Sequence, residues 1–295
     1  MATKKNGKKK KEETAGIQKA GPPAAAVPDY VRAEDANLNI EPGELQIPFV
    51  KLLQANSQQV NCEEPLGEKG DFFNTATEEN LGKELYFIPV LLNRKRICWK
   101  DFDEGGGIEC RSYDNKSGDL YGECAKCINE ETGIPRSSFG PEGEKPECTK
   151  YYDFVSVIFS DKPKIDESTK ITQSVSEFSP NALSVISFGT TKIPAARRLI
   201  MIAQAKKAAL YSGVYKMTRK FVEKKNNSFY VPEVEWFGWT APDIYKEISE
   251  NIESLRTLAG NPENYTKEDE EEVEIREEEG HYDPEADDAE DLPFV

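Results

Sequence analysis

Residues 85–99, Leu-Tyr-Phe-Ile-Pro-Val-Leu-Leu-Asn-Arg-Lys-Arg-Ile-Cys-Trp, decide the fold class. Most of them are strand formers, so the stretch predicts one long bent strand or two successive strands. Similar runs predict strands at 151–159 and 183–188. Strands at 215–222 and 228–236 flank Lys-Lys-Asn-Asn at 224–227, which is a hairpin signal.

Two helices complete the predicted core. Pro194 can occupy the first turn of a helix that continues to Tyr211 and is closed by Gly213. A second amphipathic helix is predicted over 241–258 and ends before Gly260. The predicted fold class is mainly β with two helices (α+β), and it suits an oligonucleotide-binding-type β-barrel. A generic α+β sheet is the alternative.

Charge is unevenly distributed along the chain, whose formal net charge is -16. Residues 1–44 form a basic and then Pro/Ala-rich arm, predicted to be disordered. Residues 263–295 form an acidic tail, predicted to be disordered, and hold 16 acidic residues against two basic ones. The core is expected at 45–262, with a loop insertion at about 105–150. The sequence has no membrane-spanning run and no secretory signal, so a cytoplasmic protein is expected.

Four cysteines fall in the insertion, which is rich in glycine and polar residues. Cys124 and Cys127 form a C-x2-C knuckle, and Cys110 and Cys148 lie on either side of it. This pattern favours one structural Zn²⁺ per chain, because four thiolates close a tetrahedral shell and a core-poor segment needs such a staple. A redox pair and unliganded thiols are the alternatives. Cys98 is expected in the core and Cys62 in a loop.

The only histidine, His281, lies in the acidic tail. A core without histidine excludes Ser/His and Cys/His catalytic pairs and histidine-ligated metals there. The sequence also has no phosphate-binding loop or dinucleotide fingerprint. We therefore expect a protein that is not an enzyme. The alternative is an enzyme that uses carboxylates and Mg²⁺, although no carboxylate pair stands out by its spacing.

A basic and aromatic stretch is the main candidate for ligand binding. Residues 192–225 contain ten Lys and Arg residues against one acidic residue. Single-strand binders need this combination, because cations follow the phosphates and aromatic rings stack on the bases. The alternative for any one residue is a core aromatic or a solvated lysine. The candidate DNA-binding residues are Arg94, Lys95, Arg96, Trp99, Lys192, Arg197, Arg198, Lys206, Lys207, Tyr211, Tyr215, Lys216, Arg219, Lys220, Lys224, Lys225 and Tyr230.

The acidic tail ends in an apolar tip that suits docking into a basic-rimmed pocket of a partner. Its pattern resembles the C-terminal docking peptide of bacterial single-stranded DNA-binding proteins, although there the phenylalanine is the last residue and here Val295 follows it. The matching positions, and so the candidate partner-docking residues, are Asp288, Asp291, Leu292, Pro293 and Phe294.

The rest of the chain resembles single-stranded DNA-binding proteins of tailed bacteriophages. This resemblance implies an oligonucleotide-binding barrel, a zinc subdomain and an acidic tail. It also implies a protein that binds single-stranded DNA in phage replication and recombination and recruits partner proteins through the tail. The alternative is a zinc-ribbon transcription-regulatory or interaction factor that binds duplex DNA. The sequence leaves the oligomeric state open.

Overall fold

The computed structural model describes residues 47–100, 107–141, 143, 145–173, 183–224 and 227–259. The predicted arm at 1–44, the predicted tail at 263–295 with its docking residues, and Lys225 lie outside these ranges. None of the helices within the described ranges has both the length and the apolar character required to cross a membrane.

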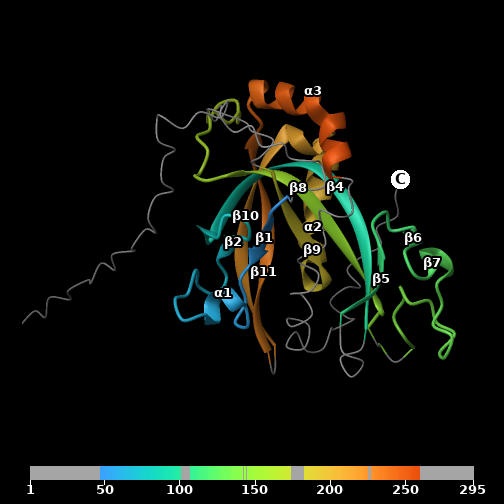
Figure 1. Ribbon diagram of the computed structural model, residues 1–295. Helices are drawn as coiled ribbons and strands as arrows, with labels where there is room; N and C mark the ends of the chain where they lie inside the picture. Colours follow the sequence, from blue (N-terminus) through green and yellow to red (C-terminus); the bar gives the residue numbers. More distant parts are fainter. Residues whose placement is uncertain are drawn as a thin grey trace, which may run out of the picture. The chain divides into compact units, whose positions relative to one another are not determined.

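A single sheet of nine strands contains most of the described chain (Figure 1). Its order is β11-β10-β4-β8-β9-β1-β2-β3, with β5 paired to β4. The strands are β1 (Phe49–Leu52), β2 (Phe72–Asn74), β3 (Glu79–Gly82), β4 (Glu84–Trp99), β5 (Ile108–Ser112), β8 (Cys148–Phe159), β9 (Leu183–Gly189), β10 (Gly213–Lys224) and β11 (Asn227–Trp239). A separate two-stranded sheet pairs β6 (Ser117–Gly118) with β7 (Gly122–Glu123).

Strand β4 organises the large sheet. It is one strand with an irregularity between Pro89 and Leu91, where a proline without a backbone N–H interrupts the ladder. Its first half pairs with β10, its second half pairs with β5, and β8 follows it along nearly its whole length. Of the two predicted arrangements, the long bent strand is the one found.

The sheet is curled, so that β1 approaches β11 from the far side of the strand order. The side-chain amide of Gln54, which follows β1, donates to the Tyr230 carbonyl and accepts from the Tyr230 N–H, both at 2.9 Å. The Arg219 guanidinium donates to the Lys69 carbonyl and lies 3.8 Å from the Asp71 carboxylate. These contacts join β1 and the loop before β2 to the β10–β11 hairpin, which the pairing of strands leaves unconnected.

Two helices cover the hydrophobic clusters of the sheet (Figure 1). Helix α3 (Pro242–Ala259) packs Ile244, Ile248 and Leu255 against a cluster that includes residues of β4, β8 and β9. Helix α2 (Ile193–Ala205) buries a stripe of small and branched residues in a second cluster, which includes residues of β10 and β11. The buried stripe comprises Ala195, Ala196, Leu199 and Ala203.

The mainly β architecture predicted from the sequence is confirmed, and the described ranges contain three α-helices instead of the two predicted. The additional helix, α1 (Gln58–Asn61), is a single turn. The first predicted helix ends six residues early, at Ala205 instead of Tyr211, because Lys207 adopts a left-handed φ of 51° that breaks the helical repeat. Tyr211 belongs instead to the 3-10 turn η7 (Leu210–Ser212).

Candidate nucleic-acid interface and cysteine cavity

Four cations and one tyrosine form a patch at the junction of β4, β8 and α2. We call Arg94, Arg96, Lys150, Tyr152 and Arg197 the Tyr152 patch. Arg94 and Tyr152 are direct cross-strand partners, and the guanidinium carbon lies 5.9 Å from the ring centroid. The Lys150 ammonium lies 4.9 Å from the same centroid. The sheet register therefore gathers positive charge around one aromatic ring.

Arg96 and Lys150 also stand directly opposite each other, on β4 and β8. Like charges in this position destabilise a strand pair. Within the described ranges, no carboxylate forms an ion pair with any of the four cations of the patch, or with Lys192, Arg198, Lys206 or Lys207. The patch thus presents positive charge that an anionic ligand would neutralise.

The ionisation of Tyr152 reflects this local charge. Burial by itself would raise the pKa of Tyr152. The hydrogen bond from Lys150, the charges of Lys150 and Arg197 and the hydrogen bond from Arg197 together lower that pKa below its ordinary value. The sum of these effects means that the site favours negative charge at the tyrosine oxygen.

Helix α2 carries its other cations on the exposed face. Arg197 and Arg198 are exposed, opposite the buried alanine stripe. Past the helix end, the exposed Lys206 places its ammonium 4.1 Å from the Trp236 ring centroid and 5.4 Å from that of Trp239. Such cation–π contacts keep a lysine stem close to an aromatic surface while its charge stays accessible. Lys207 is exposed, and Lys192 is half-buried.

The cations of the β10–β11 hairpin are mostly engaged with carboxylates. Lys216 contacts Glu84 at 2.5 Å, and Lys220 contacts Glu233 at 3.3 Å. Arg219 stacks on Tyr230, with 4.8 Å from the guanidinium carbon to the ring centroid, and belongs to the contacts that close the sheet. All four predicted DNA-binding residues named here therefore already have partners within the protein: Lys216, Arg219, Lys220 and Tyr230.

Three predicted DNA-binding residues are buried and are corrected here. Lys95 is 4% exposed and lies 3.2 Å from Asp153, in an interior ion pair. Trp99 packs with Ile97 and Tyr151, and Tyr215 is fully buried. None of the three side chains offers a surface to a ligand. The burial of Lys95 follows from the alternation of side chains along a strand, because its two neighbours Arg94 and Arg96 face the other way.

The remaining candidates are not among the residues of the Tyr152 patch. Tyr211 is half-buried and packs on Tyr245, with ring centroids 5.2 Å apart. Lys224 ends β10, and its side chain is not described; Lys225 falls outside the described ranges.

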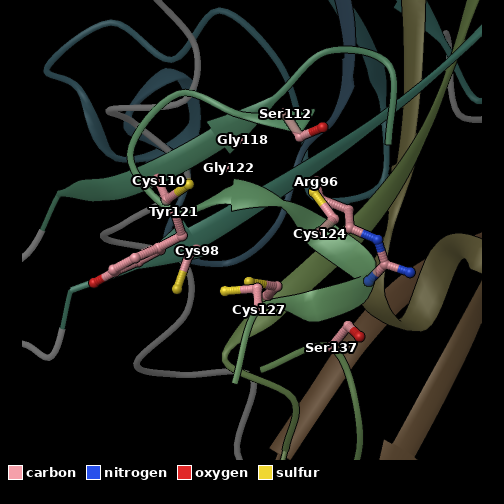
Figure 2. A pocket seen from close by; sticks show the side chains of 11 residues that line it. Arg96, Cys98, Cys110, Ser112, Gly118, Tyr121, Gly122, Cys124, Cys127 and Ser137 are labelled. Atoms are coloured by element: carbon pink, nitrogen blue, oxygen red, sulfur yellow. The ribbon is translucent and has the colours of Figure 1, made fainter. Parts of the chain in front are cut away.

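The cysteines of the insertion line a small cavity of about 20 Å³ (Figure 2). The cavity also takes in Arg96 and Tyr121. The knuckle is a 3-10 turn, η4 (Cys124–Lys126), in which the Cys127 N–H donates to the Cys124 carbonyl at 3.4 Å. The structure thus brings the four predicted zinc ligands together, and it adds a fifth cysteine, Cys98 of β4.

No group of three or more His, Cys, Asp or Glu side chains in the described ranges is arranged to hold a metal ion. The zinc site therefore stays a prediction. The place of Cys98 beside Trp99 in a strand predicted a core residue and gave no signal of the cavity. Cys98 is buried, as predicted, but it is also part of the cavity. Cys62 is exposed, outside the cavity, in the loop that follows α1.

Comparison with known proteins gives one clear relationship. The sequence profile of the Pam3 phage gp34-like protein family matches residues 17–260, which include the Tyr152 patch and all five cavity cysteines but stop short of the acidic tail. No curated protein matches the chain significantly. No solved structure matches it significantly. Because the profile covers most of the chain, the protein belongs to the Pam3 phage gp34-like family.

Proposed function

We propose that this phage-family protein binds single-stranded DNA without strong sequence preference and acts in phage replication or recombination. The observation that carries the proposal is the Tyr152 patch, whose four cations have no carboxylate partner within the described ranges. The net charge of the protein is -16, yet these cations without carboxylate partners lie together on one surface. That surface should attract a polyanion.

The chemistry of the surrounding surface favours a single strand as that polyanion. Phosphates of a nucleic acid would offset the repulsion between Arg96 and Lys150, and displaced counterions would contribute to affinity. The half-buried aromatic rings of Trp236 and Trp239 lie under Lys206, a residue of the basic stretch at 192–225. Unpaired bases can stack on such rings, whereas bases inside a duplex cannot.

The topology supports an oligonucleotide-binding barrel. Strands β4, β8 and β9 form an antiparallel meander, α2 follows, and β10–β11 is a hairpin whose first strand pairs with β4. We propose that these five strands correspond, in chain order, to the five strands of that fold. The departure is β1, which pairs in parallel with β9 and lies where the third and fifth barrel strands would meet.

This correspondence assigns roles to two loops. The cysteine segment connects the first and second barrel strands, and residues 224–227 connect the fourth and fifth. In oligonucleotide-binding barrels these two connections border the ligand face. We propose that the cysteine segment is held in shape by one structural Zn²⁺ and forms one border of the groove. We further propose that the acidic tail docks partner proteins through Asp288, Asp291, Leu292, Pro293 and Phe294.

The proposal is tested by measuring the affinity of the full chain for fluorescent oligonucleotides of increasing length, single-stranded and duplex, at several salt concentrations. We expect sequence-tolerant, salt-sensitive binding to single strands and much weaker binding to duplex. The double variant Arg94→Ala/Arg197→Ala should bind single strands more weakly, with the slope of log affinity against log salt flatter by roughly 1.4, about 0.7 for each lost phosphate contact.

The matched control is Lys246→Ala/Arg256→Ala on α3, which also removes two exposed cations. It should bind like the parent chain. Equal or tighter binding of duplex would overturn the proposal and favour a duplex-binding regulatory factor. Equal losses in both double variants would show that only net charge matters and would remove the Tyr152 patch as the binding site.

A further inference from the structure

Three of the five cavity cysteines form a row across three adjacent strands. Cys98 of β4 stands directly opposite Cys110 of β5 on one side and Cys148 of β8 on the other. Opposed residues in antiparallel strands have Cβ atoms about 4.5–5.5 Å apart, while the two outer strands are separated by two strand spacings, roughly 9.5 Å. Cys98 therefore lies between the two outer thiols.

The other two cysteines belong to the knuckle, which lies over this row. The Cys124 N–H donates to the Lys116 carbonyl at 2.7 Å, and the Cys127 carbonyl accepts from the Arg136 N–H at 3.1 Å. The Cys148 N–H in turn donates to the Arg136 carbonyl at 2.8 Å. These bonds fix the knuckle to both flanks of the cavity, and in Figure 2 the sulfurs of Cys98 and Cys127 point into the same space.

Cys98 is buried between a carboxylate and a guanidinium group. Its side chain is 1% exposed, its sulfur lies 3.4 Å from a Glu109 carboxylate oxygen, and an Arg136 nitrogen approaches it at 4.0 Å. Arg136 also pairs with Glu147 at 2.6 Å and with Glu109 at 3.5 Å. Two carboxylates thus hold Arg136 close to the Cys98 sulfur.

We propose that the cavity binds one Zn²⁺ and that Cys98 is one of its ligands. A tetrahedral ion with Zn–S bonds of about 2.3 Å places its four sulfurs roughly 3.8 Å from one another. Once Cys124 and Cys127 occupy two positions, two remain for the three thiols of the row. Neighbours in the row can meet that spacing, whereas an ion that bonds both outer thiols would lie on Cys98. Cys98 is thus a ligand, and either Cys110 or Cys148 completes the shell.

Each thiol that becomes a ligand gives up its proton to solvent. The inference rests on the zinc site of the proposed function but not on DNA binding, so it is tested without nucleic acid.

The test is a competition titration of the full chain with Zn²⁺ against a chromogenic chelator, together with the absorption spectrum of the Co²⁺-substituted protein. We expect one ion per chain. Cys98→Ser should lower the affinity at least a hundredfold and weaken the sulfur-to-cobalt charge-transfer band. Cys110→Ser and Cys148→Ser should each lower it less, because the other outer thiol replaces the one removed, and the double variant should match Cys98→Ser.

The matched control is Cys62→Ser, which removes an exposed thiol outside the cavity and should bind like the parent chain. A Cys98→Ser variant that binds like Cys62→Ser would overturn the inference and leave Cys110, Cys124, Cys127 and Cys148 as the ligands. A parent chain that binds neither ion, or whose cavity thiols form a disulfide, would overturn the zinc site as a whole while leaving the DNA-binding proposal untouched.

A second measurement covers the case in which Cys98→Ser does not fold. In the parent chain labelled with ¹³C at cysteine Cβ, addition of Zn²⁺ should move the Cys98 resonance along with those of Cys124 and Cys127. A Cys98 resonance that stays in the position of a free thiol would overturn the inference.

Discussion

The Lys95 ammonium lies 3.2 Å from the Asp153 carboxylate in the interior of the protein, with both side chains at most 5% exposed. Ser187 donates a further hydrogen bond to Asp153 at 2.6 Å, and the Lys95 ammonium lies over the rings of Phe49 and Tyr151. This ion pair ties β4 to β8 on the sheet face opposite the Tyr152 patch, so it contributes to the fold and not to ligand binding.

Lys95→Met should destabilise the protein by about 3–5 kcal/mol, because it leaves the Asp153 carboxylate buried without its partner charge. Urea unfolding of the variant measures the loss. The double variant Lys95→Met/Asp153→Leu should recover most of it, since no unpaired charge remains. Single-strand affinity per folded molecule should equal that of the parent chain. A stable Lys95→Met variant with weaker DNA binding would return Lys95 to the binding surface.

Lys206 and Lys216 should respond differently to removal of their charge. Lys206→Gln should flatten the salt dependence of single-strand binding by about 0.7 in slope, because Lys206 has no carboxylate partner in the described ranges. Lys216→Gln should leave the slope nearly unchanged, because Lys216 is already paired with Glu84. Fluorescence titrations at four or five salt concentrations give both slopes. If the two slopes change equally, existing ion pairs do not decide which cations meet phosphate.

Tyr215→Phe should leave the protein as stable at neutral pH, or more stable by about 1–3 kcal/mol. The Tyr215 hydroxyl is buried, and no hydrogen-bond partner for it occurs among the described residues, so its removal eliminates a desolvated polar group without breaking a bond. Chemical unfolding of the two proteins side by side checks the sign. A loss above 1 kcal/mol would mean that the hydroxyl has a partner.

The same substitution should alter the response to alkaline pH. Burial raises the pKa of Tyr215 to about 12, so the folded state holds this proton more tightly than the unfolded state does. Ionisation of Tyr215 leaves the free energy of unfolding unchanged below pH 10. It lowers this free energy as the pH rises from 10 to about 12, where the unfolded state has released the proton and the folded state still holds it. Tyr215→Phe should therefore lose less stability between pH 10 and 12 than the parent chain. Parallel losses would show that Tyr215 ionises with an ordinary pKa.

Removal of the residues after Gly280 should tighten single-strand binding at low salt, because it removes acidic residues that compete with phosphate for the basic surface. The affinity difference between full-length and truncated chains should shrink as salt is added. An unchanged affinity at low salt would restrict the tail to docking partners or keeping the protein soluble.

Local patterns predicted the individual elements well. The strand formers of 85–99, 151–159 and 183–188 and the hairpin around 224–227 appear as β4, β8, β9 and β10–β11. The last helix was predicted over 241–258 and is found over Pro242–Ala259, because Ile244, Ile248 and Leu255 lie on one buried stripe. In each of these elements the period of apolar residues matches the backbone geometry and is visible within one window of sequence.

Such local patterns could not predict the pairings between segments that are distant in the sequence. The ion pair of Lys95 joins residues 58 positions apart, and nothing local to Arg94-Lys95-Arg96 distinguishes the inward cation from the outward ones. Cys98 became part of the cysteine cavity only through its register with Cys110 and Cys148. The parallel pairing of β1 with β9 depends on how the sheet curls, which the sequence of neither strand reveals.

The direct pairing of Cys98 with Cys148 has a consequence for how this protein can vary. The chain leaves β4 just after Cys98 and returns to the sheet first as β5, on the other side of β4, and then as β8 at Cys148. The register of β4 against β8 is thus complete where the intervening segment begins and ends. The segment between Cys98 and Cys148 can therefore change in length and sequence without shifting the register of β4 against β8. A hairpin turn that joins the two strands directly would yield a smaller version of the sheet, and another loop could be grafted at the same place.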